Sequence, residues 1–430
     1  MTQTNAKNEF TLEIDALSYG PYGIGRLDGK AVMIPNTAPG DKVVARIVEA
    51  KERYDVGEVV RFIDSSPVRQ SPPCPYVNEC GGCPWQHIRY HAQLKAKQQC
   101  VEDSLRRIGK LDGFDLCPII PSPREYGYRR RIRLQLDHNK RLGFYRASSH
   151  RIVEIASCLI AAEEVNDCLA SLRRWVGQFR APLAQLEIVT GDQPGEIVVV
   201  AKFSGEFVPH DEELCHRLLQ ETSPIRGLVV TGRHWRRAWG HTKISVLTED
   251  GIRSVADADV FTQVNPDGNR IVLGELISAG EFGGGDRALE LYCGAGNFTL
   301  SIAKRVGEVV AVEGYRPSIE WGKLNAQVNG LENIHWTASH VPAAVERFAK
   351  RRERFSKIVL DPPRNGAKGI DRDLAALGAP KILYVSCNPT TLARDLSALT
   401  KHGYKLTRVQ PIDLFPHTFH VEILAVMKRE

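Results

Sequence analysis

The sequence predicts an α/β protein: a Rossmann-like domain at the carboxyl terminus, preceded by a small β-barrel and a central α+β domain. From Val260 onward, strand-like and helical patterns alternate, as they do in a parallel sheet covered by helices. Residues 10–62 instead contain short β-rich runs separated by glycine and proline, which is typical of a small barrel. At roughly 150 residues per domain, a chain of 430 residues is long enough for three domains, which we expect at 1–67, 68–259 and 260–430.

The composition is that of an ordinary globular protein. Hydrophobic residues make up 43% and charged residues 25% of the chain. The first residues, MTQTNAKNEF, lack the apolar core of a signal peptide, and no apolar run is long enough to span a membrane. We therefore expect a cytoplasmic protein without a membrane partner. In that reducing compartment, 10 cysteines indicate metal binding or catalysis rather than disulfides.

The barrel is predicted from the alternation of strands and turns in residues 10–62. Runs such as TLEIDALSY and KVVARIVEA alternate with turn sequences such as GPYGIGRLDGK and APGD. Small barrels of this kind often bind single-stranded nucleic acid, so we expect RNA binding here. The alternative is a β appendage without a partner.

A cysteine cluster follows the linker SSPVRQSPP. Cys74, Cys80 and Cys83 have the spacing C-x5-C-x2-C in a loop rich in proline and glycine. Thiols this close together in a loop are rarely core residues, and they indicate a metal site. A fourth ligand is missing locally, and Cys158 is the candidate for it. Zinc and an iron–sulfur cluster both take four thiolates, and the spacing does not decide between them.

The central segment also contains a helix and two basic regions. Residues 91–110 have helical periodicity with a basic outer face, and we assign the helix to 91–115. Residues 124–151 carry nine Arg and Lys against two acids, with aromatic residues interleaved, and residues 226–243 contain no acid. A solvated face is the ordinary explanation of a charge run. Basic and aromatic residues mixed in strand-like sequence favour an RNA-facing surface instead.

The stretch RALELYCGAGNFTLSIAKRV indicates a strand, a glycine-rich turn and a helix. Gly294 and Gly296 allow a ligand to approach the backbone at the helix start. About twenty residues later, a second strand ends in Glu313, which is placed to bind ribose hydroxyls. Thr299 replaces the third glycine of the dinucleotide fingerprint, and Glu290 suits the charged amino-acid part of S-adenosylmethionine. The methyl donor is therefore favoured over NAD.

Two further strands end in chemically reactive residues. SKIVLDPPRNG is a buried strand that ends in Asp361, and KILYVSCNPT is an apolar strand that stops at Cys387. Proline cannot extend a strand ladder and restricts the residue before it, so the chain turns at Asn388. Cys387 then lies at the carboxyl end of a parallel strand, where open α/β sheets bind ligands. A lone cysteine is more often structural, but the last strand begins beside Glu422, which brings a carboxylate to the same region.

A thiolate, a carboxylate and a methyl donor together indicate methylation of an unreactive carbon such as C5 of uracil. Addition of the Cys387 thiolate to C6 gives an enolate with electron density on C5. C5 then attacks the sulfonium methyl, Glu422 removes the C5 proton, and the thiol is eliminated. The nucleotide must leave its stack to reach the pocket. The amide and aromatic groups of residues 261–265 are suited to holding it there.

The motifs of the chain resemble those of the bacterial RNA 5-methyluridine methyltransferases. They are FTQVN, LYCGAGNF, DPPR, SCNPTTLARD, PHTFHVE and the C-x5-C-x2-C loop with a later cysteine. The similarity covers nearly the whole chain and is closest to the branch that has an iron–sulfur cluster and modifies 23S ribosomal RNA. It implies that the amino-terminal segment is a TRAM domain, an OB-like RNA-binding barrel. It also implies that the helix of the central segment packs on the catalytic domain.

The same resemblance implies a role for individual residues. It makes Cys387 the nucleophile and Glu422 the proton acceptor. Where the family commonly has an amide or an acid near the adenine, this chain has His340, which we expect to contact the cofactor. The ligands of a [4Fe-4S] cluster would be Cys74, Cys80, Cys83 and Cys158. The residues around S-adenosylmethionine would be Gln263, Tyr292, Asn297, Glu313 and Asp361, with Gln263 and Asp361 also near the uracil.

The sequence leaves three other functions open. One is 5-methyluridine formation in the T-loop of tRNA, although the short enzymes of that type generally lack both the barrel and the cysteine cluster. A second is a non-catalytic RNA-binding factor, which would not need Cys387 together with Glu422. The third is an NAD-dependent oxidoreductase. In each case we expect a monomer without an obligate protein partner.

Overall fold

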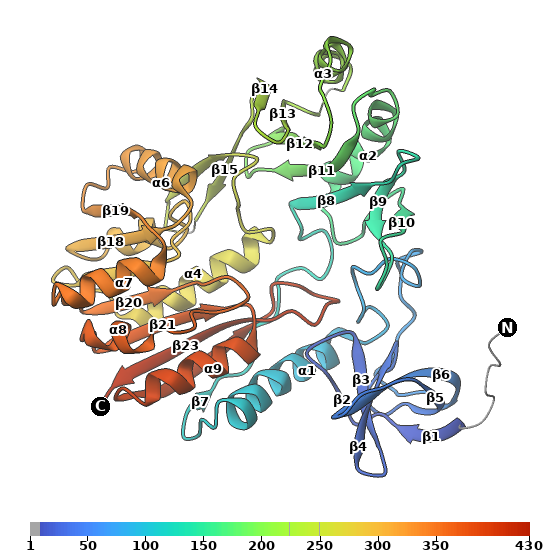
Figure 1. Ribbon diagram of the computed structural model, residues 1–430, viewed down its shortest axis with the longest axis horizontal. Coiled ribbons are helices and arrows are strands. Elements are labelled where there is room, and N and C mark those ends of the chain that lie inside the picture. Colours follow the sequence, from blue (N-terminus) through green and yellow to red (C-terminus); the bar gives the residue numbers. More distant parts are fainter. Residues whose placement is uncertain (1–8, 223, 249) are drawn as a thin grey trace.

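The computed structural model describes residues 9–222, 224–248 and 250–430. Within them the strands form an amino-terminal barrel, a central sheet, a two-stranded ribbon and a carboxyl-terminal sheet (Figure 1). Nowhere in these ranges is there a helix with the length and apolar character needed to cross a lipid bilayer.

The amino-terminal barrel is a six-stranded sheet with the strand order β1-β5-β6-β4-β3-β2. Neighbouring strands are antiparallel except β4 and β6, which are parallel. Side chains alternate across each strand, so that Leu12, Val32, Ile34 and Val43 are buried in its core. The strands are β1 (Glu9–Glu13), β2 (Ala16–Leu17), β3 (Tyr22–Leu27), β4 (Lys30–Pro35), β5 (Lys42–Ala50) and β6 (Tyr54–Asp64).

The central sheet has the strand order β10-β9-β8-β11-β12-β13-β14, and α2 and α3 cover one of its faces. Leu172, Trp175 and Leu218 of these helices share a buried cluster with Ile188 and Val199 of the sheet. The ribbon β15–β16 leads into the carboxyl-terminal part. The elements are β8 (Arg131–Leu136), β9 (Leu142–Tyr145), β10 (Ile152–Glu154), α2 (Glu163–Val176), β11 (Leu183–Thr190), β12 (Ile197–Phe203), α3 (Pro209–Glu221), β13 (Gly227–Thr231), β14 (Arg236–Gly240), β15 (Lys243–Leu247) and β16 (Arg253–Asp257).

The carboxyl-terminal sheet has the order β19-β18-β17-β20-β21-β23-β22-β7. Strands β19, β18, β17, β20 and β21 are parallel, whereas β23 is antiparallel to both of its neighbours. The elements are α4 (Pro266–Gly280), β17 (Arg287–Leu291), α5 (Thr299–Ala303), β18 (Glu308–Glu313), α6 (Arg316–Val328), β19 (Ile334–Ala338), α7 (Val341–Lys350), β20 (Lys357–Leu360), α8 (Asp371–Ala376), β21 (Lys381–Ser386), α9 (Pro389–Thr400), β22 (Tyr404–Ile412) and β23 (Glu422–Arg429).

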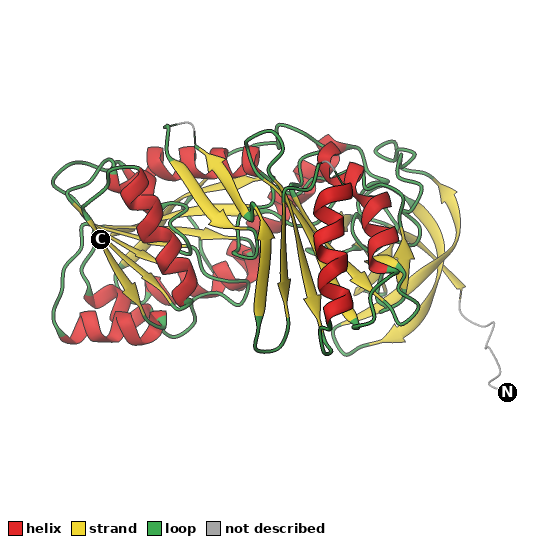
Figure 2. Cartoon of the chain, turned by 90° about the horizontal axis from the view of Figure 1, so that it is seen from above, coloured by secondary structure: helices red, strands yellow, loops and turns green. Residues whose placement is uncertain are grey.

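Helices cover both faces of this sheet (Figure 2). Helices α4, α5 and α6 contribute to the core on one face, and α7, α8 and α9 to the core on the other. A strand covered on both sides has no solvent-facing residues, which explains why β21 reads as a continuous apolar run rather than an alternating one. The predicted α/β architecture with a parallel sheet is confirmed.

Helix α1 (Tyr90–Asp103) continues into a π-helical turn (Ser104–Ile108) and packs against the carboxyl-terminal sheet through Val101 and Leu105. The expectation that this helix extends to residue 115 is wrong. Lys110 and Gly113 have positive φ angles of 54° and 71°, which a helix does not accommodate. Residues from there on turn into β7 (Asp115–Leu116), which pairs with β22.

Candidate active site

The strand directions bring the predicted reactive residues to one edge of the carboxyl-terminal sheet. Because β17, β18, β20 and β21 are parallel, Tyr292, Glu313, Asp361 and Cys387 all lie at or just beyond the carboxyl ends of their strands. Strand β23 runs the opposite way, so its first residue, Glu422, lies at the same edge. The predicted position of Cys387 at the end of a parallel strand is confirmed.

Cys387 and Glu422 leave the sheet next to each other. Ser386 and Ile423 form the last residue pair between β21 and β23. Beyond this pair, Cys387 follows Ser386, and Glu422 precedes Ile423, because the two strands are antiparallel. Glu422 is also the charged neighbour with the largest effect on the Cys387 thiol. Only 7% of Glu422 is exposed. The partly exposed thiol and the buried carboxyl group therefore lie next to each other at the end of the sheet.

The pKa of the Cys387 thiol is raised to about 11, chiefly by burial and then by the negative charges of Glu422 and Asp361, against the opposing effect of Arg364. Burial also raises the pKa of Asp361 and Glu422, and the proximity of Asp361 adds to the effect on Glu422. Two carboxyl groups this close do not both ionise readily. These shifts favour the neutral thiol and oppose ionisation of both carboxyl groups at once in the free protein.

The turn after Cys387 is fixed by short-range hydrogen bonds that its sequence explains. Asn388 precedes Pro389 and caps helix α9, since its side-chain oxygen accepts from the N–H of Thr390 at 3.0 Å. The Asn388 amide donates to the carbonyl of Arg364 at 3.1 Å. This bond joins the segment of residues 361–364 to the turn that follows Cys387, so that Arg364 is held beside Cys387.

The strand order reverses at β17, which lies between β18 and β20, and open α/β sheets bind ligands in the crevice outside the carboxyl ends of the strands at such a point. In the turn after β17, Tyr292, Gly294 and Gly296 have φ values of 65°, 55° and 95°, and such an angle at a tyrosine is a strained conformation typical of functional sites. The N–H of Gly294 donates to Glu313 at 3.1 Å. This hydrogen bond joins the turn to Glu313 at the end of β18.

Glu290 is the most unusual group beside this crevice. It is buried, with 1% of its surface exposed, and burial raises its pKa to about 8. Within the part of the chain that the structure describes, its Oε2 has no hydrogen-bond partner. A buried carboxyl oxygen without a partner is costly, which indicates that a ligand donates to it.

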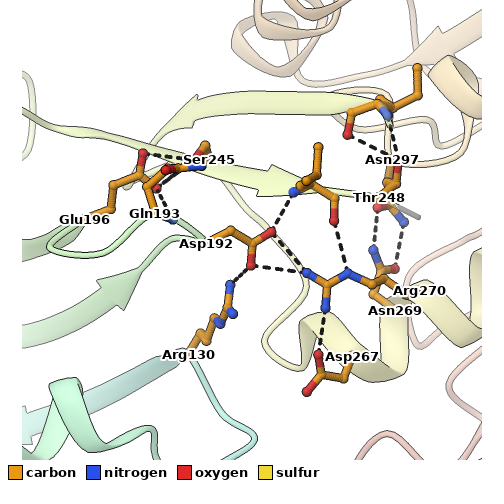
Figure 3. A network of polar contacts seen from close by, with 12 residues as sticks. Arg130, Asp192, Gln193, Glu196, Ser245, Thr248, Asp267, Asn269, Arg270 and Asn297 are labelled. Carbon is orange, nitrogen blue, oxygen red and sulfur yellow. Dashed lines mark hydrogen bonds and ion pairs between the residues drawn. The ribbon is translucent and has the colours of Figure 1, made fainter. Parts of the chain in front are cut away.

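The other predicted cofactor residues lie around the same crevice with different degrees of exposure. Asn297 exchanges two hydrogen bonds with Asn269 of α4, at 2.8 and 3.0 Å (Figure 3). Gln263 is partly exposed in the loop before α4, whereas His340 is exposed at the start of α7. A Cβ atom on Gly314 would lie 3.7 Å from the Nδ1 of His340, so His340 lies close to the end of β18.

Helix α4, which contains Asn269, also joins the crevice to the central sheet. Arg270, next to Asn269, pairs with Asp192 at 3.1 Å and with Asp267 at 2.6 Å (Figure 3). Asp192 follows β11 and also binds Arg130. These ion pairs tie the basic segment of the central sheet to the helix that holds Asn297.

The four predicted metal-binding cysteines line a single cavity of about 640 Å³. The pKa of the Cys80 thiol is raised to about 11, chiefly by burial, with smaller contributions from the nearby Cys158 and Cys74. The pKa of the Cys83 thiol is also raised, first by burial and then by Cys158. Across residues 9–222, 224–248 and 250–430, however, no three His, Cys, Asp or Glu side chains converge closely enough to hold a single metal ion.

The structure corrects the interpretation of the second basic region. Arg236 forms ion pairs with Asp257 and Asp259, and Arg237 pairs with Glu212. These acids are distant in the sequence, which is why residues 226–243 suggested an unopposed positive surface. The region carries less available positive charge than the sequence implied.

Sequence reasoning missed the residues that support the loop before Glu422. Lys97 of α1 is fully buried and pairs with Asp413 at 2.6 Å. The backbone N–H of Trp85 donates to the carbonyl of His417, and the ring of Tyr126 stacks on His417. A lysine among helical polar residues gives no sign of burial, because lysine is almost never buried. The contact therefore had no signal in the sequence.

Comparisons with known proteins match two regions of the chain to families. Residues 247–430 match the tRNA (Uracil-5-)-methyltransferase family, and residues 7–60 match the TRAM domain. The expected amino-terminal TRAM domain and the methyltransferase fold are thereby confirmed.

Full-length relatives agree with this result. The chain is 33% identical to the 23S rRNA (uracil(1939)-C(5))-methyltransferase RlmD of Vibrio parahaemolyticus, over 100% of this chain and 98% of that protein. It is 31% identical to an uncharacterized RNA methyltransferase of Halalkalibacterium halodurans, over 99% and 98%. The crystal structure of a Pyrococcus abyssi tRNA (uracil-54, C5)-methyltransferase with S-adenosyl-L-homocysteine superposes with a TM-score of 0.76 over 97% of this chain and 100% of that chain. At 23% identity that likeness shows the fold alone.

Proposed function

Because the chain belongs to the RNA uracil-5-methyltransferase family, we propose that it methylates C5 of a uridine in 23S ribosomal RNA with S-adenosylmethionine as methyl donor. The relative from Vibrio parahaemolyticus, whose name gives uracil 1939 of 23S rRNA as its target, supports this choice of RNA. A tRNA target is the alternative, supported by the name of the matched family model, tRNA (Uracil-5-)-methyltransferase, and by the fold of a tRNA enzyme.

The observation that carries the proposal is the pairing of β21 with β23, which leaves Cys387 and Glu422 side by side at the ligand-binding edge of the sheet. A nucleophile and a carboxyl group beside the crevice that contains Glu290 and Glu313 form the set that methylation of a pyrimidine carbon requires. A binding factor on the same scaffold would have no use for this arrangement.

In the proposed reaction, the Cys387 thiol gives up its proton to solvent, its sulfur forms a bond to C6 of the uracil, and C5 gains the electron pair of the C5–C6 double bond. S-adenosylmethionine, when bound, would supply an electrophilic methyl group to C5 and would leave as S-adenosylhomocysteine. Glu422 then accepts the C5 proton, the electron pair returns to C5–C6, and the bond between sulfur and C6 breaks. Arg364 beside Cys387 favours the thiolate, since its charge lowers the pKa of the thiol.

The chain offers a suitable set of groups for S-adenosylmethionine. The unpartnered Oε2 of Glu290 suits a buried ammonium group, and Glu313 at the end of β18 suits ribose hydroxyls. Gly294 and Gly296 keep the turn open. Tyr292, Asn297, Gln263 and His340 complete the proposed cofactor site, with Asn297 oriented by Asn269.

The uracil is held, in this proposal, by Gln263 and by the protonated member of the Asp361–Glu422 pair. A neutral carboxyl group can donate a hydrogen bond to a carbonyl of the ring, which a carboxylate cannot. Phe261, with 71% of its surface exposed, offers an aromatic face for a neighbouring base.

We also propose that Cys74, Cys80, Cys83 and Cys158 hold a [4Fe-4S] cluster. The shared cavity supports it, and each thiolate of such a cluster binds a different iron, so the four sulfurs need not converge on one point. Protein purified without air is expected to be brown with broad visible absorption, and Cys158→Ser is expected to lose most of it. A colourless protein that contains zinc would contradict the cluster.

The same proposal includes three domains, at 1–67, 68–259 and 260–430. It also includes a cytoplasmic location and a monomeric state without an obligate partner. The ion pairs of Arg270 and the burial of Lys97 join the segments into one unit. Light scattering of the purified chain tests the monomer.

The target is tested by incubating the protein with labelled S-adenosylmethionine and either 23S rRNA or tRNA transcripts, followed by nucleoside analysis. We expect 5-methyluridine in 23S rRNA, at the uracil that the name of the relative numbers 1939. Product only in tRNA selects the alternative target, and RNA binding without any product contradicts the enzymatic proposal.

A further inference from the structure

The amino-terminal barrel reaches the nucleophile. Tyr19 lies in the tight turn between β2 and β3, and its hydroxyl donates to the backbone carbonyl of Cys387 at 2.6 Å, 368 residues away in the chain. The Cys387 thiol is in turn the charged neighbour with the largest effect on Tyr19, and burial raises the pKa of the Tyr19 phenol. The phenol is therefore neutral, able to donate, and close to the sulfur.

The Tyr19 turn is itself held firmly. The N–H and hydroxyl of Ser18 both donate to the carbonyl of Tyr22, at 2.9 and 3.0 Å. The indole N–H of Trp85 donates to the carbonyl of Gly20 at 3.2 Å. The Tyr19 ring packs edge-on against Phe419 at 5.6 Å. A side chain fixed from these directions has one position available for its hydroxyl.

The hydrogen bond from Tyr19 is made to the carbonyl of a peptide group whose N–H is hydrogen-bonded as well. The carbonyl of Cys387 and the N–H of Asn388 belong to the same planar unit. Tyr19 binds the carbonyl, and the hydroxyl of Ser386 accepts from the N–H at 3.2 Å. Fixing this plane fixes the backbone angle at Cys387, and with it the direction in which the side chain leaves the main chain.

We propose that Tyr19 of the amino-terminal barrel is a positioning residue that holds the Cys387–Asn388 peptide so that the Cys387 sulfur points toward the substrate. This inference rests on the proposed function, because it assigns Cys387 as the nucleophile. It gives the barrel a part in catalysis that is separate from any role in RNA binding.

The test compares Tyr19→Phe with wild type and with Tyr22→Phe. The first variant keeps the ring that packs on Phe419 and removes only the hydroxyl. Tyr22 lies in the same hairpin, and in the described part of the chain its hydroxyl makes no hydrogen bond, so it is the matched control. The measurement is the single-turnover rate of covalent adduct formation on RNA that contains 5-fluorouridine, at saturating RNA and cofactor, together with RNA affinity and thermal unfolding.

Loss of one hydrogen bond with a net value of about 0.5–1.5 kcal/mol corresponds to a rate loss of roughly two- to tenfold. We expect that loss for Tyr19→Phe, with unchanged RNA affinity and, on ordinary RNA, a lower kcat at constant KM. Because the hydrogen bond is already present in the free protein, its loss also lowers the unfolding temperature, by a few degrees at most. Tyr22→Phe is expected to behave as wild type. Tyr19→Met also lacks the hydroxyl and repeats the test should Tyr19→Phe not fold.

Equal saturating rates for Tyr19→Phe and wild type would overturn the positioning role alone. Weaker RNA binding with an unchanged saturating rate would also overturn it, since Tyr19 would then be an RNA contact. If wild-type protein formed no adduct at all, the proposed function would fail, and this outcome is distinct from the other two.

Discussion

Ser386 and Ile423 form the last residue pair of the antiparallel strands β21 and β23. The consequence is that Cys387, which follows Ser386, and Glu422, which precedes Ile423, lie next to each other although 34 positions in between separate them in the chain. A parallel last strand would have placed Glu422 at the opposite edge of the sheet, far from the thiol. The reversal of β23 is therefore what brings the Cys387 thiol and the Glu422 carboxyl group together.

Replacement of Glu422 by glutamine is expected to trap the enzyme on ordinary RNA. Without a carboxylate to accept the C5 proton, the bond between sulfur and C6 is not released, and methylated adducts accumulate. Denaturing gels with labelled RNA measure the adduct. Cys387→Ala is the control, expected to form none while retaining RNA affinity, and normal turnover by Glu422→Gln would remove the carboxyl group from this role.

The reactivity of Cys387 in the free protein is expected to rise steeply with pH. With a pKa raised to about 11, the thiolate fraction and the rate of alkylation by iodoacetamide should increase about tenfold per pH unit between pH 7 and 10. Glu422→Gln removes the most influential negative charge and should shift the curve to lower pH. Mass spectrometry of the Cys387 peptide gives the rate, and a rate already level above pH 8 would contradict the raised pKa.

Asp361→Asn is expected to make the free protein more stable than wild type at high pH. Burial raises the pKa of Asp361 from 3.8 to about 7, so the folded state binds its proton more tightly than the unfolded state. The stability this provides is full below about pH 4 and is lost as the pH rises through 7. Asparagine does not titrate, so the variant should gain roughly 1 kcal/mol or more at pH 8 relative to pH 4. Urea unfolding at both pH values measures the difference, and a gain at pH 4 instead would contradict the sign.

Lys97→Ala is expected to destabilise the fold by about 3–5 kcal/mol, because it leaves Asp413 buried without its partner. Lys95 is exposed on the same helix, and Lys95→Ala is the matched control with an expected change below about 0.5 kcal/mol. Urea unfolding compares the two. Equal, small effects would show that the buried ion pair contributes little.

The fold and the reactive residues were largely predictable because their signals are local. An apolar run followed by Asn388-Pro389 specifies a strand that stops at Cys387, and the glycine-rich turn after β17 specifies a crevice. Alternation of strands and helices then indicates which edge these residues share. None of these inferences requires knowledge of a distant contact.

The remaining features depend on contacts between distant segments. Nothing near Tyr19 indicates that its hydroxyl meets Cys387, and Arg236 looks unopposed until the fold brings Asp257 and Asp259 beside it. The end of the helix was overestimated for a different reason. The helical pattern of residues 91–110 does not mark where the helix ends, because the positive φ of Lys110 has no signature in that pattern.

The most direct test of the account locates the covalent bond itself. The full chain is incubated with S-adenosylmethionine and RNA that contains 5-fluorouridine, digested with protease and nuclease, and analysed by mass spectrometry. We predict one modified peptide, which carries a methylated fluorouridine on Cys387. An adduct on another cysteine, or none on a protein that methylates ordinary RNA, would contradict the assignment of Cys387 as the nucleophile.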